Sequence, residues 1–315
     1  MLARLLSALA TVFGVAVLVF AALRGIPGGY ADIVLGPFAT PAARAVIAAR
    51  YGIDKPLAVQ FTRWIAALLH GDFGVSMVTR QPVAAEILRR LPVTGELALI
   101  ALAVALAVGL PLGVAAAASE GARRRGALGR VVGALGASVP DFVLGSVLIF
   151  IFSSWSLWLK VGGYVPFAQD PVGNLRVMAL PALTLAVFGV AVVLRTSRDA
   201  ALRVLTEGHI TAAVARGEHP WDIIRLHVLR NAAIPIVTVA ATYFGYLLGG
   251  AVVVEVLFSI PGVGFYTFSG LQNRDYAIVQ AGVLLAAVVF VAIGMLADIA
   301  YALLDPRVGA SGAAN

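Results

Sequence analysis

Six long apolar stretches divide this chain, and polar segments of very different lengths separate them. The first two, Leu5–Leu23 and Leu97–Ser119, contain no charged residue. The remaining four cover residues 138–159, 177–194, 232–254 and 277–297. About 20 apolar residues in a helix are needed to cross the roughly 30 Å of hydrocarbon in a bilayer. The pattern therefore predicts an all-α membrane protein with six transmembrane helices.

The polar segment between the first two stretches carries helix signals of its own. Thr40 and Pro41 are typical of a helix start, and Gly52 is typical of the end of that helix. A second helix is predicted from Pro56, and a third from Pro82 that leads toward the second span. The apolar face of the second helix would consist of Leu57, Phe61, Trp64 and Leu68. These helices predict a small cap, which is either a plain connector or a docking or gating surface.

A second polar stretch, HITAAVARGEHPWDIIRLHVLRN (209–231), lies between the fourth and fifth apolar stretches. Ile210–Arg216 is short and rich in alanine, which favours a compact helix. Gly217 can adopt a positive φ and end that helix, and Pro220 suits the first turn of a new one. The stretch therefore predicts a helix, a break at the glycine and a short amphipathic helix.

The second of these two helices has an apolar and a polar side. Its apolar side is predicted to hold Trp221, Ile224 and Val228. On its polar side, Asp222 and Arg225 would form an ion pair at a spacing of three residues. A helix of this type lies in the lipid interface or fills the groove of a protein partner. The residues alone leave both alternatives open.

Composition supports the membrane assignment and gives the chain an orientation. Hydrophobic residues make up 61% of the 315 and charged residues 12%, and the mean hydropathy is +0.96. A soluble domain could not cover that much apolar surface. The net charge of +7 fits the arginines that membrane proteins gather on the cytoplasmic side better than it fits nucleic-acid binding. Because residues 123–130 hold four arginines and residues 195–230 hold six, both segments and both termini are predicted to be cytoplasmic.

The chain carries no motif for catalysis or cofactor binding. It has no cysteine, which excludes disulfides, thiolate metal sites and cysteine nucleophiles. It also lacks the phosphate-binding G-x-x-x-x-G-K-[ST] loop, the H-E-x-x-H metalloprotease motif and the G-x-S-x-G hydrolase motif. For His209, His219 and His227, ordinary positions on a helix surface are favoured over a metal site. We therefore expect no bond-making chemistry, metal or cofactor in this chain.

The 209–231 stretch resembles the cytoplasmic EAA loop of ABC importer permeases, which in that family docks on the ATP-hydrolysing subunit. Gly217 stands at the position of the loop glycine, and the E-A-A positions hold Thr211, Ala212 and Ala213. The general family pattern continues as I-x-L-P, whereas this chain has His227, Val228, Leu229, Arg230 and Asn231. That form, H-x-L-R-N, resembles the dipeptide/oligopeptide/nickel subclass, and threonine in place of glutamate fits the same subclass.

The resemblance extends over nearly the whole chain. Six further segments are similar to the first, or B-type, permease of peptide importers: YGIDKPLAVQFTRW (51–64), GDFGVS (71–76), RLPVTGELAL (90–99), VVVEVLFSIPGVG (252–264), NRDYAIVQ (273–280) and LLDPR (303–307). The resemblance implies a type I ABC importer transmembrane fold with an extracytoplasmic helical segment between spans 1 and 2. It divides the chain into a first transmembrane helix at 1–24, the outer segment at 25–93, a five-helix transmembrane domain at 94–304 with its coupling loop at 195–231, and a cytoplasmic tail at 305–315.

The resemblance also implies a function. The chain would be a permease subunit of an ATP-driven, binding-protein-dependent importer of short peptides in the inner membrane of a bacterial or archaeal cell. Its partners would be a second, homologous permease, two ATPase subunits that bind ATP and Mg, and an extracytoplasmic substrate-binding protein. The residues implied to dock on the ATPase are Thr211, Ala212, Ala213, Gly217, Trp221, Ile224, Arg225, His227, Arg230 and Asn231. The alternative, a secondary ion-coupled transporter, would typically show repeated halves and broken, charge-bearing helices, and neither is clear in the sequence.

Two acidic residues are candidates for the translocation path or its outer mouth. Asp141 lies near the start of the third span, where it either faces the bundle interior or simply reaches water. Glu255 precedes SIPGVG, a helix-breaking segment that lies near the external mouth in the resembled family. Glu255 would meet the substrate or the delivering protein there, or it would be an interfacial anchor paired with Arg274, which is favoured. The candidates in this region are Asp141, Glu255, Phe258, Pro261 and Gly262.

Overall fold

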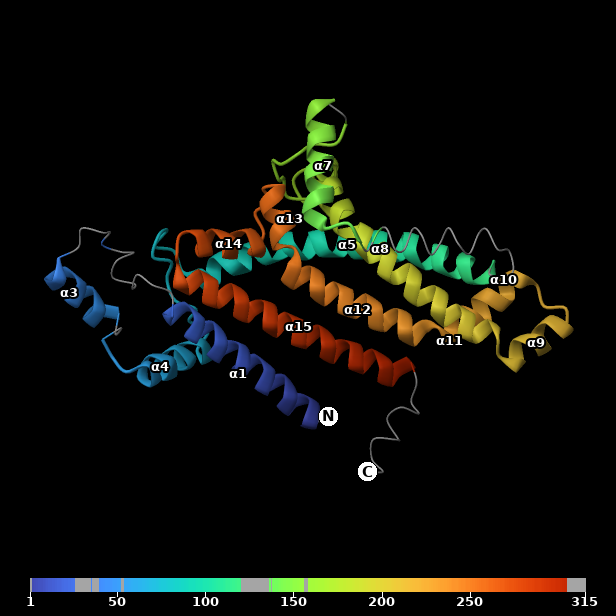
Figure 1. Cartoon of the computed structure of the whole chain (residues 1–315), viewed down its shortest axis with the longest axis horizontal. Coiled ribbons are helices and arrows are strands. Elements are labelled where there is room, and N and C mark those ends of the chain that lie inside the picture. Colours follow the sequence, from blue (N-terminus) through green and yellow to red (C-terminus); the bar gives the residue numbers. More distant parts are fainter. Residues whose placement is uncertain are drawn as a thin grey trace. The chain divides into compact units, whose positions relative to one another are not determined.

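The protein is described here by a computed structural model, which covers residues 2–25, 35, 40–51, 54–119, 136, 138–155 and 158–304. Within these residues the chain is helical, and one isolated β-bridge joins Val75 and Pro82. The helices are α1 (Leu2–Arg24), α3 (Pro41–Tyr51), α4 (Leu57–Leu69), α5 (Val83–Ala118), α7 (Asp141–Ser154), α8 (Pro171–Leu205), α9 (Gly208–Ala215), α10 (Pro220–Asp222), the π-helix η1 (Ile223–Val228), α11 (Leu229–Asn231), α12 (Ala233–Gly250), α13 (Val252–Leu257), α14 (Val263–Gln272) and α15 (Tyr276–Leu304) (Figure 1). The all-α prediction is confirmed. The predicted helix end at Gly52, the arginines at 123–130 and the tail at 305–315 lie outside the described residues.

The six predicted spans correspond to six helices of unequal length. Four of these helices, α1, α5, α8 and α15, are long and apolar enough by themselves to cross a membrane. The helix of the fifth span, α12, meets that criterion together with Pro220–Asn231, from which it is bent by 59°. The helix of the third span, α7, has 14 residues, about 21 Å of helix, which is shorter than predicted. Pro140 starts α7 with extended backbone angles, φ −63° and ψ 139°, so residues before it do not continue the same helix.

Helix starts follow the predicted signals where the chain is described. The backbone N–H of Ala43 donates to Thr40 Oγ1 at 3.2 Å, so Thr40 caps α3 as predicted. Pro56 directly precedes α4. The helix predicted to open at Pro82 and the second span are one continuous helix, α5, of 36 residues. At the start of α8, Asp170 accepts from the backbone N–H of Gly173 at 2.9 Å, with Pro171 in the first turn.

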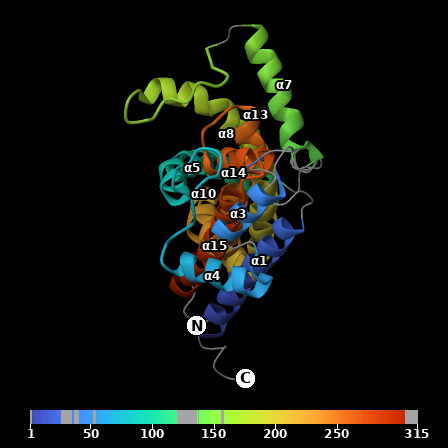
Figure 2. The ribbon, with the colours of Figure 1, turned by 90° about the vertical axis from the view of Figure 1, so that its left-hand side faces the viewer.

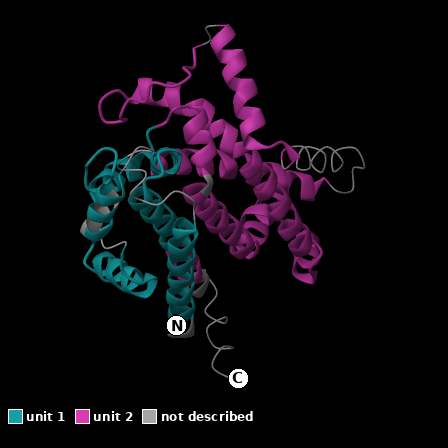
Figure 3. Cartoon of the chain, turned by 60° about the vertical axis from the view of Figure 1, so that its left-hand side comes forward, with its two compact units in different colours: residues 1–93, 261–291 teal, residues 94–260, 292–315 magenta. Residues whose placement is uncertain are grey.

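The chain forms two compact units, which Figure 3 shows in different colours. Unit 1 consists of residues 1–93 and 261–291, and unit 2 consists of residues 94–260 and 292–315. Within unit 1, α4 lies against α1 through aromatic contacts: the ring of Phe20 is 5.7 Å from Trp64 and 5.2 Å from Phe61. Trp64 also packs beside a buried cluster formed by α1 and α15. The outer helix predicted from Pro56 is therefore packed and does not lie free.

Helix α8 forms the centre of unit 2. It packs against α7, α12 and α13 (Figures 1 and 2). Glycines permit close contacts in this unit: Gly189 of α8 lies against the ring of Tyr243 of α12, and Gly145 of α7 lies against Leu257 of α13. The Tyr243 hydroxyl donates to the carbonyl of Leu185 at 2.9 Å, which satisfies a polar group inside the bundle.

Candidate functional site

The turn at Gly217 is closed by a defined set of backbone hydrogen bonds. The N–H of Gly217 donates to the carbonyl of Val214 at 2.9 Å, and the N–H of Glu218 donates to that of Ala213 at 3.2 Å. This pair of bonds is the Schellman motif, in which the residue after the helix takes a left-handed conformation. The φ of Gly217 is +76°, so the predicted glycine break is confirmed.

The helix after the break differs from the prediction. The segment Ile223–Val228 is a π-helix, in which residues five apart stack on one side. Accordingly Ile223 and Val228, 6% and 0% exposed, face the interior, whereas Trp221 is 61% exposed. The three residues predicted to form one apolar side therefore do not share it: Trp221 faces outward, as contact with lipid or a partner requires, whereas Val228 is buried and Ile224 is partly buried.

The predicted ion pair between Asp222 and Arg225 is absent, although both residues are described. The wider turn of the π-helix moves residues three apart off a common face, which explains the error. Glu218, for which the sequence predicted no role, forms the ionic contacts of this region instead. Its carboxylate accepts from Arg216 Nε at 3.1 Å and lies 3.0 Å from His227 Nε2. The hydrogen bond from Arg216, followed by the one from His227, lowers the pKa of Glu218.

The three histidines of this region are tied to neighbours on the same unit. His209 Nδ1 lies 3.1 Å from Glu207, and its ring is 5.7 Å from that of His227. His219 Nδ1 accepts from the backbone N–H of Trp221 at 3.3 Å, which helps to start α10. Among the described residues, no three His, Asp or Glu side chains are grouped so that they would hold a metal ion.

A buried apolar cluster connects this region to two long helices. Its members come from α5, α8, α9 and η1 and are Val114, Ala117, Ala201, Val204, Ile210, Ala213, Ile223 and Val228. Because interiors are packed closely, a displacement of α9 and η1 is transmitted to α5 and α8. The segment 208–231, which we call the coupling segment, is therefore mechanically joined to the membrane helices of unit 2.

The outer side of the coupling segment carries exposed apolar side chains. Val214, Trp221 and Leu226 are 60%, 61% and 56% exposed. The predicted docking residues divide by burial. Those that are exposed are Thr211, Ala212, Gly217, Trp221, Arg225, Arg230 and Asn231. Ile224 and His227 are partly buried, and Ala213 is buried.

The candidate residues of the outer mouth lie in both units. Glu255 and Phe258 belong to the interior of unit 2, with exposed fractions of 0% and 1%. Thr94 Oγ1 donates to Glu255 Oε1 at 2.7 Å, so Glu255 is an interior residue; its pairing with Arg274 stays a prediction. Pro261 and Gly262 begin the second part of unit 1 and lead into α14.

Asp141, the remaining candidate, is the first residue of α7 and is partly buried. Its side chain interacts with that of Tyr246, a residue of α12 in the same unit. The side chain is therefore neither isolated in the bundle nor fully exposed.

Hydrogen bonds join segments of unit 1 that are distant in the sequence. Asp275, from NRDYAIVQ, accepts from Ser76 Oγ at 2.7 Å and from the backbone N–H of Met77 at 2.8 Å; Ser76 ends GDFGVS. Arg90, from RLPVTGELAL, donates to the carbonyl of Pro261 at 3.3 Å. Sequence reasoning did not identify Ser76 or Asp275, because nothing in either motif shows that the two meet.

Comparison with known proteins identifies the family. Residues 109–310 match the family described as "Binding-protein-dependent transport system inner membrane component", and residues 1–98 match the N-terminal part described for the same kind of protein. The chain belongs to this family of ABC importer permeases. The resemblance found in its motifs is thereby confirmed, and the secondary transporter is disfavoured.

Individual relatives of this permease cover almost its full length. The "Probable peptide ABC transporter permease protein y4tP" of Sinorhizobium fredii is 37% identical over 307 residues, 98% of each chain. The "Glutathione transport system permease protein GsiC" of Salmonella typhimurium is 37% identical over 98% of this chain and 97% of its own. The solved structure of the MetNI methionine ABC transporter, in an inward-facing conformation, matches with a TM-score of 0.54 at 18% identity, over 70% of this chain and 96% of the other. This likeness supports the type I importer fold.

The permease is thus a multi-pass protein of the inner membrane. Its family is defined by transport that depends on a binding protein, and ABC importer permeases function with ATPase and substrate-binding partners.

Proposed function

We propose that this permease forms half of the translocation path of an importer for short peptides. A second, homologous permease supplies the other half, two ATPase subunits bind ATP and Mg, and an extracytoplasmic substrate-binding protein delivers the substrate. This chain itself binds no cofactor and catalyses no bond-making. The names of its relatives, one a peptide transporter and one a glutathione transporter, favour short peptides as the substrate class.

The observation that carries the proposal is the construction of the coupling segment. Its inner side is anchored in the cluster shared with α5 and α8, while Val214, Trp221 and Leu226 face outward. A segment that only packed against α5 and α8 would need neither a closed turn at Gly217 nor an exposed tryptophan close to that turn. Exposed aromatic and arginine side chains are typical anchors at protein interfaces. The ATPase-docking residues are Thr211, Ala212, Gly217, Trp221, Ile224, Arg225, His227, Arg230 and Asn231, and Ala213 supports them from the buried cluster.

A crosslink tests this docking surface. The chain has no cysteine, so a single Trp221→Cys variant provides one reactive thiol. In the assembled transporter we expect it to crosslink efficiently to the ATPase subunit, with a yield that changes when ATP is added. Ser154→Cys, at the exposed end of α7, is the matched control and should give no such product. Equal yields from both positions, or none from position 221, would remove the docking role.

Within the membrane part, we propose that Asp141, Glu255, Phe258, Pro261 and Gly262 line the translocation route or its outer mouth. The buried position of Glu255 and its bond from Thr94 support a role inside the permease. The domain division that accompanies this proposal is a first span at 1–24, an outer segment at 25–93, a transmembrane domain at 94–304 and a tail at 305–315.

The orientation proposed for this division places both termini and residues 195–231 in the cytoplasm, and residues 25–93 outside. Thr206 and Ala49 are both exposed, so cysteines placed there singly are accessible to a label. In intact cells freed of the outer membrane, an impermeant maleimide should label Ala49→Cys and leave Thr206→Cys unlabelled until the membrane is permeabilised. The reverse pattern would invert the topology.

A further inference from the structure

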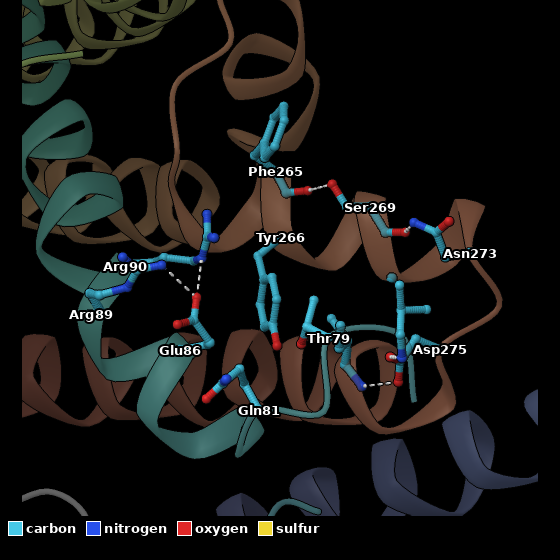
Figure 4. Close-up of a pocket in the computed structure, with 13 residues that line it drawn as sticks. Thr79, Gln81, Glu86, Arg89, Arg90, Phe265, Tyr266, Ser269, Asn273 and Asp275 are labelled. Carbon is cyan, nitrogen blue, oxygen red and sulfur yellow. Dashed lines mark hydrogen bonds and ion pairs between the residues drawn. The ribbon is translucent and has the colours of Figure 1, made fainter. Parts of the chain in front are cut away.

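A pocket of about 340 Å³ opens in unit 1 (Figure 4). It is enclosed by the loop before α5, the first turns of α5, and the helix α14 with the turn that follows it. The polar side chains of Thr79, Gln81, Arg89, Arg90 and Asn273 contribute to its wall. Its volume is within the range of small-ligand pockets, about 300–1,000 Å³.

At one side of this pocket, two arginines share a single carboxylate. Glu86 Oε2 accepts from Arg89 at 2.8 Å and from Arg90 Nε at 3.2 Å. Arg90 is further held by the carbonyl of Pro261 at 3.3 Å and by the ring of Tyr266 at 4.9 Å. The other acid in the wall, Asp275, makes the pocket neutral as a whole, and it accepts from Ser76 and from backbone N–H groups. The Arg89 side chain is 69% exposed, so its guanidinium is available to a ligand.

The floor of the pocket holds a polar atom without a partner. Tyr266 is 6% exposed, yet its hydroxyl is buried and finds no hydrogen-bond partner among the described residues. Figure 4 shows the Tyr266 side chain lying between Glu86 and Thr79. A buried phenol hydroxyl normally has a hydrogen-bond partner, because leaving it unpaired costs free energy. An acceptor that enters the pocket would satisfy it.

We propose that this pocket binds the C-terminal carboxylate of a peptide. A carboxylate is an acceptor only, so it can take two hydrogen bonds from Arg89 and one from the Tyr266 hydroxyl. A cation would be repelled by Arg89 and Arg90, and a phosphate dianion would exceed the single net positive charge of the group formed by Glu86, Arg89 and Arg90. Because the Tyr266 hydroxyl is buried and the pocket is small, the free end of a peptide chain reaches it more readily than an acidic side chain on the surface of a folded protein does. The assignment to a peptide rests on the proposed function; the carboxylate site itself does not.

Equilibrium binding to the complete transporter tests the site, in nanodiscs and without the binding protein. The probe is radiolabelled N-acetyl-glycylglycine, compared with its C-terminal amide, which has the same size and no carboxylate. We expect the acid to bind and the amide to bind at least about tenfold more weakly. Arg89→Gln should weaken binding of the acid about tenfold, and Tyr266→Phe, which keeps the ring that contacts Arg90, about three- to tenfold.

Arg63→Gln is the matched control, because Arg63 is an exposed arginine of α4 in the same unit and outside the pocket. It should leave binding unchanged. Equal binding of acid and amide, or equal effects of the substitutions at 63 and 89, would overturn the site. A different result would point to the delivering protein: no binding of the probe, together with loss of ATPase stimulation by the binding protein in Arg89→Gln. It would overturn the carboxylate site, and Arg89 would then contact an acidic side chain on the binding protein. Normal peptide uptake without probe binding would refute only this pocket, whereas probe binding without uptake would refute the proposed function.

Discussion

Gly217→Val is expected to abolish substrate uptake while the permease still inserts and assembles with its membrane partner. The φ of Gly217 is +76°, a conformation that costs ordinary residues about 1–2 kcal/mol and β-branched residues more. Valine would therefore open the two hydrogen bonds that close the turn, from Gly217 to Val214 and from Glu218 to Ala213. The coupling segment would lose the shape in which it presents Trp221.

The expected readouts are peptide uptake at background level, lowered copurification of the ATPase subunit and an unchanged yield of membrane-inserted permease. Among the described residues nothing lies within 4 Å of a Cβ at position 217, so the damage comes from backbone conformation and from volume at the partner contact. Gly217→Asn separates these causes, because asparagine tolerates the left-handed conformation. Uptake rescued by asparagine would assign the defect to the backbone, and loss with both residues would assign it to the contact. Full uptake by the valine variant would contradict the role given to this turn.

Asp275→Ala should lower stability by about 2–4 kcal/mol, because it removes both a helix cap and a set of charge-assisted hydrogen bonds. Asp275 is fully buried and directly precedes α15, where its side chain lies 3.5 Å from the backbone N–H of Ile278. Its other oxygen accepts from Ser76 and Met77, which fixes the loop before α5. Alanine would leave buried donors in that loop unpaired.

The apparent melting temperature of the purified transporter measures the overall loss, and limited proteolysis reports on the loop at residues 71–82. Ser76→Ala removes one of the donors and should give a smaller loss. A double-mutant cycle between positions 76 and 275 should show strong coupling, because the two side chains share a bond of 2.7 Å. A melting temperature unchanged in Asp275→Ala, or losses at the two positions that simply add, would show that this contact does not hold the loop.

Local patterns predicted the elements of the fold more accurately than their exposed and buried sides. Thr40 and Pro56 start helices as predicted, because a side-chain oxygen and a proline ring act on the neighbouring backbone. Trp221 shows the limit of such reasoning: an α-helical spacing placed it on one side with Val228, but with the π-helix at Ile223–Val228 the tryptophan is exposed and Val228 is buried. The π-helix is stabilised by the cluster that receives Ile223 and Val228, and that cluster is formed by residues from α5 and α8 far away in the sequence.

The sequence by itself determined that the chain is a helical membrane protein, where its spans lie, and that a glycine divides the coupling segment. These features depend on apolar length and on backbone preferences within a few residues, which are properties of local sequence. Only the tertiary structure decided that Glu218 joins Arg216 to His227, that Asp275 holds Ser76, and that Tyr266 lies unpaired beside Arg90 in a pocket. Each of these contacts depends on how segments pack in three dimensions, and no periodicity along the chain encodes the distance between two side chains of different segments.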